Sequence, residues 1–204
     1  MATPARVRGS DAVKAALVQS AAQLLGEVGP RGLSVREVAE RAGVNHGQVH
    51  HYFGGKRELL KAAMRHLAQS HFEHSTALSQ GATLPPVLSL AEDSDYWRAI
   101  CRAVIEGDLE LARTEIDENL SVPRSVLRAL QEAHGTREND FELKARFAAL
   151  AAQTLGWVAF EDFMLLLADV APDRRDALRA EVKRVMQENI EHSFAALRSE
   201  TPNE

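Results

Sequence analysis

Two helix starts separated by a very short turn lie within residues 33–53, and this spacing constrains the fold more than any other feature of the chain. Ser34 can cap a first helix, and Glu37 three residues later can complete a capping box. Gly43 tolerates the left-handed conformation that ends a helix, and a single residue separates it from a second cap, Asn45. Two short helices joined so tightly must cross steeply, as in a helix-turn-helix. Because that geometry places the second helix in the major groove, the spacing predicts DNA binding.

The second helix of this pair carries the residues expected to read DNA. Gln48 is the capping-box partner expected for Asn45. It also stands at the third position of the helix, whose N-terminal residues face base edges. Its amide can bond an adenine bidentately, and this contact can coexist with the local capping role. We expect His46 and Gly47 beside it and Val49 packed inward.

Residues 43–60 combine small, aromatic and basic side chains at fixed offsets, namely Gly43, Val44, Gly47, Tyr52, Phe53, Lys56 and Leu59. This arrangement resembles the recognition segment of the TetR family of transcriptional regulators, whose usual pattern reads Gly-Val-Ser-x-Gly-x-Leu-Tyr-x-Tyr-Phe-x-x-Lys-x-x-Leu. The chain departs from it at Asn45, where Ser is usual, at His50, where Tyr is usual, and at Gly54-Gly55, where a Pro-Ser pair is common. The resemblance covers about the first third of the chain.

The resemblance implies a homodimeric, all-helical regulator that binds double-stranded operator DNA. The simplest form is a repressor that a small-molecule effector releases from a palindromic operator. Tyr52, Lys56 and the region of Ser34 resemble the phosphate-contacting positions of the family. Lys56 also starts a helix, where unpaired N–H groups and the helix dipole favour a phosphate. The DNA-binding residues expected are Ser34, Asn45, His46, Gly47, Gln48, His50, His51, Tyr52 and Lys56.

The distribution of charge agrees with a DNA-binding end on an acidic body. The net charge of the chain is -5, which taken alone argues against a nucleic-acid partner. Residues 1–70 contain ten Lys and Arg against five Asp and Glu, a net charge of +5, whereas the remainder carries -10. A basic end is the electrostatic footprint of a DNA-binding domain.

Hydrophobic spacing is helical almost throughout, so we expect an all-α fold of about nine helices. A three-helix DNA-binding domain should occupy residues 1–55, and a larger helical ligand-binding and dimerisation domain residues 56–204. The helices expected are one ended by Gly29-Pro30, two short ones at about 35–42 and 46–52, a long one from Lys56 to about 79, and others at about 94–107, 108–119, 123–134, 140–170 and 172–199.

The last two expected helices suit a dimer interface. Apolar residues cover more than one face of residues 141–168, and the final helix carries an apolar stripe. The stripe alone could be ordinary core, but the two helices together form a self-complementary patch suited to an intersubunit four-helix bundle. The interface residues expected are Phe147, Ala151, Val158, Leu178, Val182, Val185 and Met186.

Several large side chains fall where proteins similar to this family surround a small-molecule cavity. Aromatic and Met side chains at helical spacing are more often core, and that alternative stays open here. The interior of a helical domain is nevertheless a common place for an apolar pocket. The residues expected to line it are Trp97, Cys101, Trp157, Phe160 and Met164.

An enzymatic alternative would use His46, His50 and His71 around a metal ion, because histidines three or four residues apart on a helix can chelate zinc. A stable site needs further ligands, so we expect neither a metal nor a cofactor. His74 lies three residues after His71 and poses the same question. The sequence contains no Gly-rich phosphate loop and no nucleophile-elbow pattern, and we assign no catalytic residue. The acidic clusters Glu92-Asp93-Asp95 and Asp117-Glu118 should be solvated faces.

Further alternatives within DNA binding are an activator, a regulator controlled by a protein partner, and a nonspecific architectural protein. We expect a cytoplasmic protein with no membrane partner. The densest apolar stretch, residues 155–170, is short and interrupted by Glu161, Asp162 and Asp169. The single cysteine, Cys101, excludes an internal disulfide and fits a reducing compartment.

Overall fold

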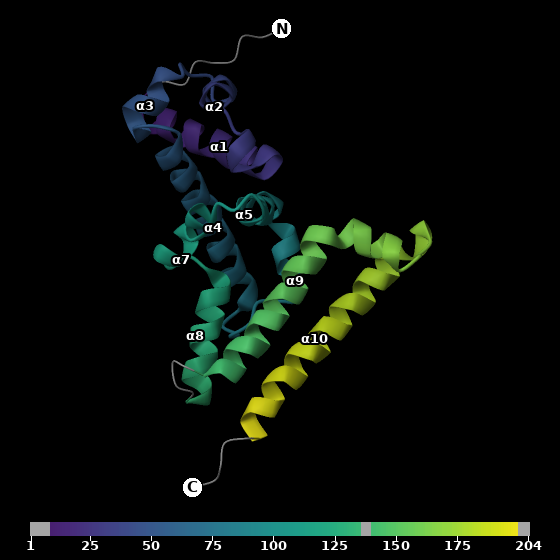
Figure 1. Cartoon of the computed structure of the whole chain (residues 1–204). Coiled ribbons are helices and arrows are strands. Elements are labelled where there is room, and N and C mark those ends of the chain that lie inside the picture. The colour runs from purple at the N-terminus through teal and green to yellow at the C-terminus, as the bar shows by residue number, and fades with distance from the viewer. Residues whose placement is uncertain (1–8, 136–139, 200–204) are drawn as a thin grey trace. The chain divides into compact units, whose positions relative to one another are not determined.

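The computed structural model describes residues 9–135 and 140–199, and within these ranges the chain is helical with no strand (Figure 1). The expected all-α fold is therefore confirmed. The chain forms two compact units. The first contains the residues up to His74 together with Asp93–Ser121, and the second contains Ser75–Glu92 and the chain from Val122 onward. This grouping by contacts differs from the expected division at residue 55, which concerns function and stays a prediction.

The first unit packs its long N-terminal helix mainly against α5. Its apolar spacing places Leu17, Ala21 and Leu24 in the core, where each is fully buried. Val28, four residues after Leu24, is 38% exposed, because the helix breaks at the next residue. The helices of this unit are α1 (Ser10–Gly32), α2 (Val35–Arg41), α3 (Gly47–Phe53), the greater part of α4 (Lys56–Ser79), α5 (Ser94–Ile105), α6 (Leu109–Ala112) and α7 (Thr114–Asp117).

The predicted end of the first helix is a break inside α1. Gly29 leaves helical geometry at φ 75° and ψ 174°, and Pro30 follows it. The interruption frees backbone groups that need partners. Two side chains of the α5 end supply them: Arg102 Nε donates to the Gly26 carbonyl at 3.0 Å, and Glu106 Oε2 accepts from the Arg31 N–H at 2.9 Å. The turn that leads into α2 is thus held by α5.

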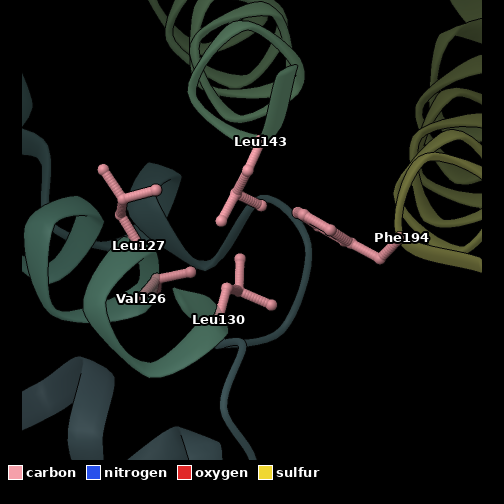
Figure 2. Close-up of a cluster of buried hydrophobic side chains, with 5 residues drawn as sticks. All are labelled: Val126, Leu127, Leu130, Leu143 and Phe194. Carbon is pink, nitrogen blue, oxygen red and sulfur yellow. The ribbon is translucent and has the colours of Figure 1, made fainter. Parts of the chain in front are cut away.

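The second unit is built from η1 (Ser89–Glu92), α8 (Val122–His134), α9 (Phe141–Leu167), η2 (Pro172–Arg174) and α10 (Arg175–Ser199). Its core joins α8, α9 and α10, and Figure 2 shows Phe194 of α10 reaching toward Leu130 and Leu143. The buried members of this core are Val126, Leu127, Leu130, Leu143 and Phe194. The predicted start of α9 is confirmed, because Asp140 Oδ1 accepts from the Leu143 N–H at 3.0 Å.

Three predicted helices differ in detail from those observed. The one expected at 108–119 forms as two four-residue helices, α6 and α7, separated by Arg113. Pro172 opens a short 3-10 turn rather than the last α-helix, whose regular geometry begins at Arg175. The long helix α9 is broken at Phe160, where φ is -126° and ψ is 20°.

Helix α9 is more exposed than a core helix. It is 27 residues long and contains an 18-residue window of mean hydropathy 1.3, so by length and composition it could cross a membrane. Residues 155–170, the stretch assessed from the sequence, cover only part of this helix and so did not show its length. Only 11% of that window is buried within the chain. The apolar side chains that it leaves exposed include Leu155, Phe160, Phe163, Leu166 and Leu167.

Candidate nucleic-acid interface

The start of α2 has the geometry that its sequence predicts. The Ser34 hydroxyl accepts from the Glu37 N–H at 3.4 Å, so the cap is formed. Leu33 and Val38, on either side of the cap, are both buried and make a hydrophobic staple. In addition, Arg41 of α2 forms a two-bond contact with the Glu27 carboxylate of α1, at 2.7 and 2.9 Å. These contacts hold α2 against the end of α1.

The turn between α2 and α3 depends on a left-handed residue. Gly43 has φ 67°, as predicted for the residue that ends the helix. Its N–H donates to the Glu40 carbonyl at 3.1 Å, and the Val44 N–H donates to the Ala39 carbonyl at 2.9 Å. These two bonds form a Schellman motif, which satisfies carbonyls at the end of α2 and reverses the chain within one turn.

The predicted cap of α3 is corrected by one residue. His46 is the N-cap, and Asn45 lies just before it. Asn45 Oδ1 still accepts from the Gly47 N–H at 2.8 Å, so the side chain satisfies one orphan donor as intended. In the described chain no side-chain bond joins Gln48 to Asn45, and the expected capping box is absent. The amide of Gln48 is therefore not occupied by a capping role.

The faces of α3 are divided as a DNA-reading helix requires. Val49 is fully buried, which confirms its predicted inward packing, and Phe53 is half-buried. Gln48 and Tyr52 are half-buried at the border of the buried face. The exposed face carries His46, Gly47, His50 and His51.

Two basic residues stand beside this face. Lys14 of α1 places its ammonium 5.4 Å from the centre of the Tyr52 ring, and His51 meets the same ring edge-on at 4.7 Å. Apart from its charge, nothing in the sequence points to Lys14. Lys56 is the first residue of α4 and half-buried, and within the described residues no carboxylate lies within ion-pair distance of it. Its ammonium is free for an anionic partner.

Other basic residues of the N-terminal region have acidic partners. Arg57, Lys61 and Arg65 lie four residues apart on α4, and we call them the α4 basic stripe. Arg57 contacts Asp108 at 2.6 Å. Burial acts to raise the pKa of the Asp108 carboxyl, but the hydrogen bonds from Arg57 and the Leu111 N–H and the charge of Arg57 together hold that pKa below its usual value. Lys61 pairs with Glu110 at 3.0 Å and Arg65 with Glu118 at 2.6 Å, while Glu110 also accepts from Arg57. Part of the positive charge of residues 1–70 is thus neutralised by acidic residues of the α6 and α7 region. The excess of basic residues is therefore not explained by DNA binding alone, which corrects that interpretation.

Comparison with known proteins identifies this interface. The family model described as "Bacterial regulatory proteins, tetR family" matches residues 17–63, which span α1 to the first turns of α4. A helix-turn-helix-type transcriptional repressor of Mycobacterium tuberculosis is 28% identical over 185 residues, covering 90% of this chain and 92% of the relative. The chain therefore carries a DNA-binding domain of the TetR family. It is a helix-turn-helix transcriptional regulator.

Solved structures agree with this family at the level of the fold. A tetR-family transcriptional regulator from Streptomyces coelicolor superposes with a TM-score of 0.63 at 16% identity, covering 94% of this chain and 89% of that one. A transcriptional regulator from Pseudomonas aeruginosa superposes with a TM-score of 0.59 at 22% identity, covering 93% of both chains.

Two histidines of α4 and an acidic residue at the start of α5 form a polar cluster. Asp93, predicted to be solvated, accepts from His71 at 2.6 Å and from His74 at 2.9 Å through its two oxygens. His71 is buried and stacks on Tyr96, whose hydroxyl bonds Glu115. Asp93 is also the N-cap residue of α5, but its side chain does not cap that helix. Burial and the Glu115 charge raise the pKa of Tyr96. No group of three metal-ligating side chains occurs in the described part of the chain.

The residues expected to line an effector cavity divide between the two units. Trp97 and Cys101 are half-buried on α5 in the first unit, and burial raises the pKa of the Cys101 thiol. Trp157 and Met164 are half-buried on α9 in the second unit, and Phe160 is exposed at the break in that helix. That these five residues surround one cavity stays a prediction.

The expected dimer residues are unequally available to a partner. Val158 and Met186 are buried within the second unit, and Phe147 packs against its core. Ala151, Leu178 and Val182 are half-buried, and Val185 is exposed. Phe163 and Leu166 of α9 are more exposed than most of these residues and were not among them, because helical periodicity does not show which face of a helix the chain covers.

Proposed function

We propose that this TetR-family regulator is a homodimeric repressor that binds a palindromic operator and is released by a small-molecule effector. The observation that carries the DNA-binding part is the exposure of one face of α3 while Val49 anchors the opposite face. Residues 1–55 form the DNA-binding part and residues 56–204 the ligand-binding and dimerisation part. A cytoplasmic location follows from the need to reach DNA. The repressor name of the Mycobacterium tuberculosis relative supports repression rather than activation.

In this proposal the α3 side chains divide into base-reading and phosphate-contacting groups. Gln48, free of a capping role, hydrogen-bonds a base edge, and His46 and Gly47 lie beside it. Phosphates are contacted by Tyr52 and by Lys56, whose ammonium has no carboxylate partner in the described chain. Asn45, His50, His51 and the Ser34 region flank these contacts. Phosphate contacts set the register, and base contacts set the sequence preference.

The dimer follows from the apolar surface that α9 leaves exposed. Leu166 is 66% exposed and Leu167 64% exposed, so the single chain covers little of this face. Contiguous exposed apolar surface marks an interaction site. A second copy is the simplest partner, because a two-fold axis lets one patch cover itself. Two recognition helices related by that axis then read two half-sites of one operator.

Effector release is a linkage between two binding sites. A ligand that favours the arrangement unable to reach two half-sites lowers operator affinity. Operator DNA must then lower ligand affinity by the same factor. Titration of a candidate ligand with and without operator measures both factors. A ligand that binds equally well in the two titrations is not the effector.

Selection of bound sequences from random double-stranded DNA tests the proposed function. We expect an inverted repeat with half-site centres about 34–36 Å apart, or a multiple of that distance. This spacing would establish sequence preference and two-fold symmetry together. A pool that is retained without any enriched sequence would indicate nonspecific binding, and a single unrepeated half-site would argue against the dimer.

A further inference from the structure

The second unit contains a pocket that none of the five predicted cavity residues lines. Its volume is about 460 Å³, and its walls come from the end of α4, residues 82–87, α8 and α10. The pocket borders the core drawn in Figure 2. Leu130 and Phe194 belong to that core, and Leu84 and Ile190 pack against it. Small-molecule sites in proteins have volumes of about 300–1,000 Å³ and are largely apolar.

The lining defines the chemistry of a ligand. None of its thirteen residues is charged, and only Ser79, Thr83 and Gln187 carry polar side chains. The Gln187 amide N–H donates a hydrogen bond to the Glu191 carboxylate at 2.7 Å, and the Ser79 hydroxyl donates one to the Ser75 carbonyl at 2.7 Å. The oxygens of these two side chains therefore remain as acceptors. A charged ligand would lose hydration without compensation, whereas an uncharged ligand with one donor would be satisfied.

One wall of the pocket is held in shape by its backbone. Pro85 and Pro86 fix their own φ angles. Gln80 and Leu88, on either side of this wall, have left-handed φ angles of 47° and 64°. Residues other than glycine rarely adopt this conformation, and strain of this kind is found where surrounding structure or a ligand clamp imposes it. The backbone of this wall and of its flanks is thus restricted.

We propose that this pocket is a small-molecule site for an uncharged, largely apolar compound with a hydrogen-bond donor at one end, such as a phenol, an aryl amine or a long-chain alcohol. As an effector site it rests on the proposed function. Leu78 and Ser79, which line the pocket, close the same helix α4 that Lys56 opens. A ligand in the pocket would therefore contact the same helix that carries a proposed phosphate contact.

The first test is binding of N-phenyl-1-naphthylamine, an uncharged aryl amine whose fluorescence rises in apolar surroundings. We expect saturable binding of one probe per chain. Ala133→Trp on α8 and Thr83→Trp in the segment 82–87 should each weaken binding of the probe by at least about tenfold. The matched control is Glu132→Trp, an exposed neighbour on α8 whose side chain is not in the lining. It should keep the wild-type affinity, and circular dichroism melting identifies any variant that does not fold.

The second test compares two competitors on the wild-type chain. 1-Naphthol should displace the probe at least about tenfold better than 1-naphthoate. The two compounds share a ring system, but 1-naphthoate carries a negative charge that the lining cannot compensate. Equal displacement would overturn the proposal. So would the absence of saturable probe binding, or full affinity in a folded filler variant. Binding to the selected operator is measured on the same preparations. Loss of probe binding with operator binding intact overturns only the pocket, whereas probe binding without specific DNA binding overturns only the proposed function.

Discussion

Gly29 shows how one residue joins local conformation to tertiary packing. Its φ of 75° disfavours any side chain, and a β-carbon there would lie 2.0 Å from Glu106 Oε1. The same Glu106 carboxylate binds the Arg31 N–H. An added methyl group must therefore displace an established hydrogen bond as well as strain the backbone. The position leads directly into the cap of α2.

We predict that Gly29→Ala destabilises the chain by about 2–3 kcal/mol, from left-handed strain plus one lost hydrogen bond. Gly107→Ala is the matched control, because Gly107 has φ 80° but nothing within 4 Å of a new β-carbon. It should cost only about 1–2 kcal/mol. Urea unfolding followed by circular dichroism measures both. Equal losses would mean that the contact with Glu106 yields without cost.

Alanine substitutions in α3 and in α4 should change DNA binding in different ways. Lys56→Ala should weaken binding to every sequence and reduce the salt slope of binding by about 1 per chain, because a phosphate contact releases counterions. Gln48→Ala should relax preference at one position of each half-site, by about 1–3 kcal/mol against the best base. Fluorescence anisotropy on operator and scrambled duplexes over a salt series separates the two. Equal loss of specific and nonspecific binding in Gln48→Ala would contradict its role as a base reader.

At the scale of elements, α4 is joined to α6 and α7 by the α4 basic stripe. Each member is one turn from the next, so all three face the same way. Arg57 pairs with Asp108, and the hydrogen bond that it donates to this carboxylate raises the pKa of the Arg57 guanidinium. Asp108 also accepts from the Leu111 N–H at 3.1 Å, which caps α6. One carboxylate thus starts a helix and fixes its neighbour.

The depressed pKa of Asp108 predicts how stability depends on pH. A carboxyl with a lower pKa in the folded state stabilises the fold above its unfolded pKa of about 4 and loses that effect as the pH falls through the folded pKa. Asp108→Asn should therefore cost about 1 kcal/mol at pH 7, discounted for partial exposure. The difference from wild type should shrink below about pH 4. Urea titrations at several pH values measure it.

The control for this pair is Asp117→Asn. Asp117 meets Arg113 at 3.1 Å within one exposed stretch, where both side chains are open to solvent. Exposed pairs of this kind contribute little. Its substitution should leave the urea midpoint unchanged at every pH. A loss comparable to that of Asp108→Asn would mean that overall charge, rather than the specific contact, sets the pH dependence.

At the scale of the whole molecule, assembly depends on the exposed face of α9. We predict that the wild-type chain elutes at twice its mass of 22.4 kDa and that Phe163→Glu elutes at the mass of one chain. Phe163 is 55% exposed, so a carboxylate there remains hydrated in the monomer but would be buried in the dimer. Light scattering coupled to gel filtration measures the mass, and circular dichroism checks the fold.

Val104→Glu is the matched control for assembly. Val104 is an apolar residue of α5 that is 48% exposed, close to the exposure of Phe163. A charge there should leave the dimer intact. If both variants remain dimeric, the interface does not use this face of α9. If the wild-type chain is monomeric at high concentration, the proposed dimer fails.

Local chemistry made much of this molecule predictable from sequence. The caps at Ser34 and Asp140 and the left-handed Gly43 act within four or five residues, so their bonds can be read from spacing. The inward packing of Val49 follows from helical periodicity. The same local signals pointed to the face of α3 proposed to meet DNA. Even the one-residue shift of the α3 cap stays within this range, because Asn45 still bonds the helix start.

Only the tertiary structure decided which partner each long side chain chose. Asp93 could have capped α5 or met solvent, and it instead holds His71 and His74, about twenty residues away. The basic residues of α4 were equally suited to phosphates, and three of them bind acids some fifty residues later. Charge attracts at any sequence separation, so composition and periodicity do not select the partner. The partner is decided when the helices pack and bring distant side chains together. Helix packing likewise decides which apolar faces are covered, and it leaves one face of α9 exposed.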